Sequence, residues 1–270
     1  MRKPRVVSIS AGIAVAMAAA FVAVFALAAP GYAAASDHYV ALGDSYASGL
    51  GAGSYISSSG SCDRSTKAYP ELWAAAHSPG TFNSVACAGA TTSTVVSSQL
   101  SAVTSSTTLV SITIGGNDVG FSTIMTTCVL QGTTACVNAV QAGENTANTV
   151  LPGRLDTVYS GIRSRAPSAR VVVLDYPVFY QLGTLCVGLS DTSHKKIDEG
   201  INLLDGIISA AATRNGVVFA DVRSTFVGHQ LCSGHDWLHS LNILNINESY
   251  HPTADGQSGG YYPVFNGYSS

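Results

Sequence analysis

The chain has 270 residues, of which 46% are hydrophobic and 11% are charged. This size is enough for one domain with a complete core and too small for two large domains. With 13 basic and 16 acidic side chains, the chain lacks the basic surface that nucleic-acid binding requires, so no nucleic-acid partner is expected.

The first 35 residues have the composition of an export signal. Three basic residues precede an apolar stretch at about 6–29, and small residues of the Ala-x-Ala type follow Pro30. An uncleaved membrane anchor is the alternative, since the apolar stretch is long enough to span a bilayer. The small residues before Ser36 favour cleavage. We therefore expect a signal peptide at 1–35, a single domain at 36–270 and a secreted protein.

Short apolar stretches alternate with helix-like stretches along the rest of the chain. The pattern predicts strands at 38–43, 82–86, 109–114, 169–174 and 217–222, and helices at 68–77, 92–103, 138–165 and 197–213. This alternation indicates an α/β fold with a parallel sheet covered on both faces. In such sheets, ligands bind at the carboxyl ends of the strands.

A serine follows the first predicted strand, in the segment Gly43-Asp44-Ser45-Tyr46. A serine hydroxyl is a weak nucleophile until a base removes its proton. At the start of a helix, the hydroxyl would be accessible and the backbone N–H would favour nearby negative charge. The alternative is that Ser45 only caps the helix.

Two further strand ends carry groups that acyl transfer needs. Gly89, after the second strand, offers a backbone N–H, and Asn117, after the third, offers a side-chain amide. Both are candidate oxyanion donors, and the alternative is that they are ordinary turn residues.

One of the seven histidines is the candidate base. His251 lies in a loop-like segment after the last strand, and Pro252 restricts it to an extended conformation that would project the ring. A purely structural histidine is the alternative.

Four blocks in this order resemble the SGNH hydrolases, also called the GDSL family. The blocks are Gly43-Asp44-Ser45-Tyr46, Gly89 with its neighbours, Gly116-Asn117-Asp118 and Tyr250-His251-Pro252. Each block is weak alone, but the four together cover about residues 38–265. With six cysteines and an export signal, the chain is similar to the secreted lipases, esterases and phospholipases of actinobacteria.

The resemblance implies a flavodoxin-like three-layer sandwich with about five parallel strands. It implies that Ser45 is the nucleophile and that His251 is the general base and then the general acid. It also implies an oxyanion hole from the Ser45 N–H, the Gly89 N–H and the Asn117 side chain. Neither a metal nor an organic cofactor is expected.

The orientation of the histidine stays open. Much of the family has an aspartate three residues before the histidine, and here that position is Glu248. Its carboxylate would hold the imidazole tautomer and stabilise the imidazolium. The alternative is a main-chain carbonyl from around Glu248 or Ser249, which would give a Ser–His dyad.

All six cysteines follow the signal, and an even number in an exported chain indicates three disulfides. Six cysteines allow 15 pairings. Sequential pairing closes the shortest loops, so we expect Cys62–Cys87, Cys128–Cys136 and Cys186–Cys232. No metal site is expected, because there is no Cys-x-x-Cys and because Asp236, not a glutamate, follows His235 in the His-x-x-x-His segment ending at His239.

The sequence therefore predicts a serine ester hydrolase of the lipase, esterase or phospholipase type. Apolar residues near the histidine block favour lipid-like acyl chains, although they would also suit a core: Trp237, Leu238, Leu241, Ile243, Leu244 and Ile246. A carbohydrate acetylesterase is the alternative within the fold, and a non-catalytic glycan-binding module is the alternative outside enzymes. The expected partners are a small-molecule or lipid ester and, transiently, a lipid interface. The chain is expected to be a monomer.

Overall fold

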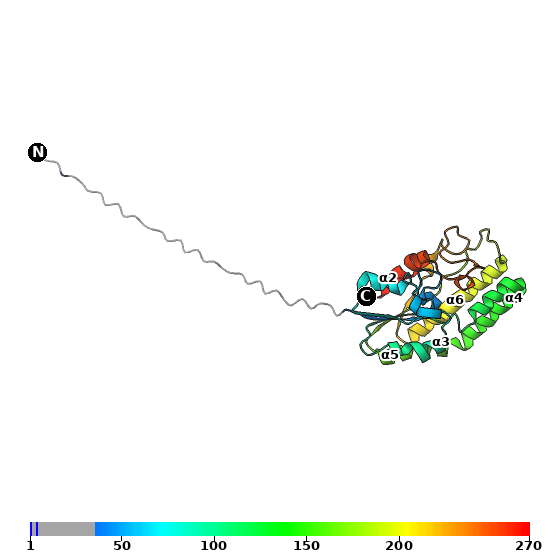
Figure 1. Cartoon of the computed structure of the whole chain (residues 1–270), viewed down its shortest axis with the longest axis horizontal. Coiled ribbons are helices and arrows are strands. Elements are labelled where there is room, and N and C mark those ends of the chain that lie inside the picture. Colours follow the sequence, from blue (N-terminus) through cyan, green and yellow to red (C-terminus); the bar gives the residue numbers. More distant parts are fainter. Residues whose placement is uncertain (2–3, 5–35) are drawn as a thin grey trace. The chain divides into compact units, whose positions relative to one another are not determined.

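The computed structural model describes Met1, Pro4 and Ser36–Ser270 (Figure 1). The expected signal peptide therefore lies outside the described residues, apart from Met1 and Pro4. Among the residues that are described, no helix is both long enough and apolar enough to cross a membrane.

Five parallel strands form one sheet in the order β2-β1-β3-β4-β5. The strands are β1 His38–Gly43, β2 Thr81–Ser84, β3 Leu109–Thr113, β4 Arg170–Leu174 and β5 Val218–Ala220. Every residue of the central strand β3 is buried, because helices cover both faces of the sheet. The α/β sandwich expected from the sequence is confirmed.

Helices lie on both faces of the sheet (Figure 1). On one face α2 packs against the C-terminal α7, and on the other α5 packs against α6, which also contacts α4. The longer helices are α2 Tyr69–His77, α4 Phe121–Thr149, α5 Leu151–Arg165, α6 Asp191–Arg214 and α7 Tyr262–Tyr268. Two short helices, α1 Ser45–Ser48 and α3 Thr92–Thr94, follow β1 and β2.

The strand order changes direction between β1 and β3. The chain leaves β1 for β2 on one side of it and later returns to place β3 on the other side. This is the topological switch point, where the carboxyl ends of two adjacent strands diverge and leave a crevice for a ligand. The segment that carries Ser45 follows β1, and the segment that carries Asn117 follows β3.

The helices agree with expectation in part. The helix expected at 92–103 is present as one continuous helical segment from Thr92 to Ala102 whose winding changes along its length, and Gln99 within it is buried against the end of β1. The helix expected at 138–165 divides into α4 and α5, with Pro152 in the first turn of α5. The sequence did not predict α7 or the first part of α4, whose threonine-rich stretch has low helix propensity.

α4 folds back on itself in the middle. Gly132 has a left-handed φ of 79° and divides the helix into two arms. The Cys128–Cys136 disulfide joins the arms, and Ile124 lies against Gly143, where an added Cβ would come within 2.6 Å of the Ile124 side chain. Packing between the two arms of α4 therefore stabilises a helix whose residues have low helix propensity.

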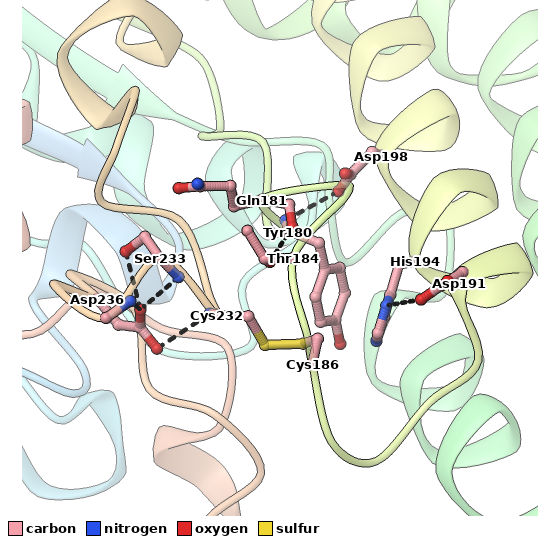
Figure 2. The surroundings of a disulfide bond; sticks show 11 residues. Tyr180, Gln181, Thr184, Cys186, Asp191, His194, Asp198, Cys232, Ser233 and Asp236 are labelled. Atoms are coloured by element: carbon pink, nitrogen blue, oxygen red, sulfur yellow. Dashed lines mark hydrogen bonds and ion pairs between the residues drawn. A yellow bond between two sulfur atoms is a disulfide. The ribbon is translucent and has the colours of Figure 1, made fainter.

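The structure pairs the cysteines in the sequential order that was expected: Cys62–Cys87, Cys128–Cys136 and Cys186–Cys232. Figure 2 shows Cys186–Cys232, which ties the loop before α6 to the loop after β5. Next to it, Tyr180 stacks on His194 with their ring centroids 4.0 Å apart. Two of the disulfides, Cys62–Cys87 and Cys186–Cys232, thus fasten loops, and the third joins the arms of α4.

Candidate active site

Ser45 is the first residue of α1, directly after β1. The residue that caps the helix is its neighbour Asp44, whose Oδ1 accepts a hydrogen bond from the Tyr46 N–H at 3.0 Å. The Ser45 hydroxyl is therefore not used for capping, which was the alternative reading of this position. Ser45 Oγ lies instead 2.8 Å from His251 Nε2.

The hydrogen bonds of His251 define its tautomer. Nδ1 lies 3.0 Å from the carbonyl oxygen of Ser249, which can only accept, so Nδ1 carries a proton. In the neutral ring, Nε2 then holds the lone pair and accepts the hydrogen bond from Ser45 Oγ. This arrangement can move a proton from the serine hydroxyl to the imidazole.

The Glu248 carboxylate faces another group. Its Oε1 accepts a hydrogen bond from the Tyr55 hydroxyl at 2.7 Å, and that hydroxyl accepts one from the Gly51 N–H at 3.0 Å. Glu248 reaches His251 only through its main-chain carbonyl, which accepts the His251 N–H at 3.1 Å. Of the two alternatives left open by the sequence, the geometry favours a main-chain carbonyl, that of Ser249.

Burial controls the protonation of His251. The residue is 7% exposed, and removal from water lowers the pKa of the imidazole from 6.5 to about 4, outweighing the opposing effect of the Ser249 carbonyl. The ring is therefore neutral at pH 7, the form that can accept a proton.

Three donors lie beside the serine. Gly89 and Asn117 line the same groove as Ser45 and His251. Within the described chain, the backbone N–H groups of Ser45 and Gly89 donate to no protein acceptor, and one Asn117 amide hydrogen is directed to the Ala90 carbonyl at 2.9 Å. The Ser45 and Gly89 N–H groups and the second Asn117 amide hydrogen are the kind of donors that an oxyanion formed beside Ser45 would need.

A buried aspartate fixes the glycine block against the asparagine block. Asp118 Oδ2 accepts the Thr92 N–H at 2.8 Å, and its Oδ1 accepts the Thr92 hydroxyl at 2.6 Å. Arg154 Nη1 donates to the same Oδ1 at 3.2 Å. The positions of Gly89 and Asn117 relative to each other therefore depend on charge-assisted hydrogen bonds.

The model of the GDSL-like lipase/acylhydrolase family matches residues 41–258. The chain belongs to this family. It is 55% identical over 267 residues to Lipase 1 of Streptomyces coelicolor, covering 99% of both chains. The crystal structures of phospholipase A1 from Streptomyces albidoflavus NA297 and of an extracellular lipase from Streptomyces rimosus superpose with TM-scores of 0.85 and 0.84. Each of these is 54% identical and covers 87% of this chain and 100% of its own.

The family expected from the four sequence blocks is thus confirmed, and the chain is a carboxylic ester hydrolase. In this GDSL-like hydrolase the aspartate of the nucleophile block also has a structural role. Asp44 Oδ2 accepts the Tyr176 hydroxyl at 2.5 Å, and that hydroxyl accepts the Gly116 N–H at 3.0 Å. Tyr176 therefore joins the serine block to the asparagine block beneath the groove.

Sequence reasoning missed Tyr176 as part of the site. The available signal was its position two residues after the end of β4, at the same edge of the sheet as the other blocks. A second missed contact joins the serine and histidine blocks of the GDSL-like hydrolase, where the Tyr46 hydroxyl donates to the Tyr250 carbonyl at 2.7 Å. Tyr46 was part of the recognised block, but its partner lies 204 residues away.

The segment from His235 to His239 belongs to the scaffold. His239 Nε2 lies 2.7 Å from the Gly51 carbonyl. Trp237 stacks on His229 with ring centroids 3.6 Å apart and packs edge-on against Phe226. Leu241 and Ile246 are the nearby apolar residues that line the groove.

The pKa of His251 gives a direct test by NMR. In the folded protein the ring should titrate with a midpoint near pH 4 and so remain neutral at pH 5.5, because burial disfavours the imidazolium. In urea the same ring should titrate near its ordinary value of about 6.5. The signal is assigned by its loss in His251→Ala. A folded-state midpoint near 6.5 would contradict the buried, uncharged base.

Substitution of Glu248 distinguishes the two ways of orienting the histidine. The Glu248 carboxylate contacts Tyr55 and not the His251 ring. Glu248→Gln should therefore lower kcat for a soluble ester by only about three-fold, an effect no larger than the free energy of one neutral hydrogen bond. Tyr55→Phe, which removes the other half of the contact, should have a similar small effect. A loss of several hundred-fold in Glu248→Gln would show that the carboxylate is required.

Proposed function

We propose that this chain is a secreted lipase that hydrolyses lipid esters through an acyl-enzyme on Ser45. The observation that carries the proposal is the continuous hydrogen-bonded series from Ser45 Oγ through both nitrogens of His251 to the Ser249 carbonyl. These residues line a groove that the candidate oxyanion donors Gly89 and Asn117 also line. The proposal uses only residues of the chain and no cofactor.

In the first step, Ser45 Oγ attacks the ester carbonyl carbon while its proton passes to His251 Nε2. The N–H groups of Ser45 and Gly89 and the Asn117 amide hold the negative charge on the carbonyl oxygen. The C–O bond to the alcohol then breaks, and His251 returns the proton to the leaving oxygen. Water repeats the sequence on the acyl-enzyme, releasing the acid and restoring Ser45.

Secretion is part of the proposal. It is supported by the export-signal composition of residues 1–35 and by the three disulfides, which persist in oxidising compartments. The solved relative from Streptomyces rimosus is described as an extracellular lipase. We propose that the mature chain acts as a monomer of residues 36–270.

A lipid substrate is supported by the relatives, which are named lipases and a phospholipase A1. Apolar residues line part of the groove beside Ser45, including Phe121 and Met125. A carbohydrate acetylesterase needs a polar site with space for acetate only, and no feature of the groove favours that alternative. A glycan-binding module has no need for a serine paired with a buried neutral histidine.

We also propose that the rim of the groove contacts the lipid interface. Ile243 and Leu244 are 84% and 93% exposed on a loop whose Leu241 and Ile246 line the groove. Leu130, 74% exposed, lines it from α4. Exposed apolar side chains beside a substrate groove gain free energy by entering a lipid layer, about 1.5–3 kcal/mol for each that is fully buried.

Ser45→Ala should lower kcat for p-nitrophenyl esters on the order of 10⁴-fold or more, because no other group supplies the nucleophile. A fluorophosphonate probe should label the wild-type protein and not the variant. Ser122→Ala, at an exposed serine that lines the same groove, is the matched control and should be labelled like the wild type. Retained turnover in a folded Ser45→Ala protein would disprove the assignment.

If the loop that carries Ile243 and Leu244 contacts the lipid interface, its substitution should affect activity on lipid vesicles and not activity on a soluble ester. The double variant Ile243→Ser/Leu244→Ser should lose about ten-fold or more of its activity on phosphatidylcholine vesicles, since the loss of apolar burial weakens adsorption. Its kcat/KM for a soluble ester should stay near the wild-type value. Leu185→Ser is the control, because Leu185 is 94% exposed and does not line the groove. Equal losses in the control and the double variant would refute the rim as the contact surface.

A further inference from the structure

His239 is hydrogen-bonded to the backbone of the proposed base. Its N–H donates to the His251 carbonyl at 2.9 Å, and the Tyr250 N–H donates to the His239 carbonyl at 2.7 Å. Leu238 and Pro252 form an antiparallel bridge beside these two bonds. The segment that carries His239 is therefore paired with the loop that carries His251.

The His239 side chain contacts a different loop. Its Nε2 lies 2.7 Å from the Gly51 carbonyl oxygen, which can only accept, so Nε2 carries a proton and donates it. Gly51 lies in the turn after α1, and this turn is bonded to the nucleophile, because the Leu50 N–H donates to the Ser45 carbonyl at 3.1 Å. One hydrogen bond of His239 therefore joins the histidine loop to the turn after Ser45.

Gly51 packs directly against the base. It has a left-handed φ of 92°, and a Cβ added to it would lie 3.0 Å from the His251 Cβ and 2.8 Å from the Pro252 carbonyl oxygen. These distances leave no room for a side chain. A displacement of Gly51 would therefore change the space that His251 occupies, and with it the 2.8 Å contact between His251 Nε2 and Ser45 Oγ.

The contacts form a closed series, in which each residue is bonded to the next and the last returns to the first: Ser45, Leu50, Gly51, His239 and His251. The hydrogen bond from His239 is partly buried. The Tyr55 hydroxyl, which accepts the Gly51 N–H, belongs to a residue that is 39% exposed, so water can take its place. Of the two groups that hold Gly51, His239 is therefore the one that solvent replaces less well.

A second hydrogen bond joins the same two segments. The Tyr46 hydroxyl donates to the Tyr250 carbonyl at 2.7 Å and is buried. This bond would keep the histidine loop beside the serine helix if the His239 side chain were replaced. We therefore expect loss of the His239 bond to alter the fine placement of the base without unfolding the protein.

We propose that His239 is a positioning residue for the base: by holding Gly51 against His251, its Nε2–H keeps the imidazole within hydrogen-bonding distance of Ser45 Oγ. The inference rests on the proposed acyl-enzyme at Ser45, in which a proton passes between these two side chains. Proton transfer needs heavy atoms about 2.6–3.2 Å apart, so a small displacement is enough to slow it. His239 itself lies outside the set of described residues that line the groove.

A charge on His239 would act in the opposite direction. Burial is the largest cause that lowers the pKa of His251 to about 4, and a positive charge on His239 is a smaller cause of the same sign. Such a charge opposes the imidazolium that forms when His251 takes the serine proton. The hydrogen bond of His239, and not its charge, is therefore the useful property.

The test removes the charge with and without the hydrogen bond. His239→Leu has no donor, whereas His239→Gln carries an amide N–H with the same reach as Nε2. On a soluble p-nitrophenyl ester, His239→Leu should lower kcat by about ten-fold while KM stays within about two-fold. Labelling of Ser45 by the fluorophosphonate probe should slow by a similar factor, because it needs the same proton transfer. His239→Gln should restore kcat to within about three-fold of the wild type.

His229→Leu is the matched control. His229 stacks on Trp237, and its Nδ1 contacts the His235 carbonyl at 2.9 Å, so it belongs to the same part of the fold without contacting the turn after Ser45. Its kcat should stay within about two-fold of the wild type. If His239→Leu does not fold, His239→Asn replaces it in the comparison, because its amide is one bond shorter and does not reach the Gly51 carbonyl.

Three results would overturn the inference. They are a wild-type kcat in His239→Leu, equal losses of kcat in His239→Leu and His239→Gln, and an equal loss in the His229→Leu control. The first would show that the bond is not needed, the second that charge or ring volume matters instead, and the third that any change in this region has the same effect. Failure of the proposed function looks different, because the wild type would then hydrolyse no ester and take no fluorophosphonate at Ser45.

Discussion

The parallel pairing of β1 with β3 is the constraint on which the site depends. Gly43, at the end of β1, pairs with Thr113 and has a left-handed φ of 124°. A Cβ at this position would lie 2.9 Å from the Thr113 nitrogen, so the close approach requires glycine. Gln99 holds the Gly43 backbone by two hydrogen bonds, at 2.8 and 2.9 Å. This pairing brings the segments that carry Ser45 and Asn117 out of adjacent strands at the same edge.

Buried hydrogen bonds then fix the loops that the sheet brings together. Tyr176 joins the serine block to the asparagine block through Asp44, and Tyr46 joins the serine helix to the histidine loop. Asp118 holds the glycine block in the same way. Each of these contacts connects segments far apart in the chain, so the geometry of the site is a property of the folded core. Preorganised donors of this kind need no reorganisation when charge develops on the substrate.

The partner of His251 has an electrostatic consequence. A main-chain carbonyl fixes the tautomer as a carboxylate would, but it carries no full charge to stabilise the imidazolium. Burial adds to this effect, lowering the pKa of the ring to about 4. The imidazole is therefore neutral over a wide pH range. In the proposed mechanism, the protonated ring would be a stronger acid than an ordinary imidazolium, which suits return of the proton to a leaving alcohol.

The amino-acid sequence alone determined the fold class, most of the strands and the sequential disulfides, and it predicted the serine and the histidine of the proposed site, because these follow from local apolar patterns, strand-end motifs and short loops. It did not determine which oxygen orients His251, since Glu248 turns toward Tyr55, 193 residues away. The contacts of Tyr176 with Asp44 and Gly116 were equally absent from any local pattern. Only the tertiary structure decides such features, because hydrogen-bond partners and empty space depend on how distant segments pack.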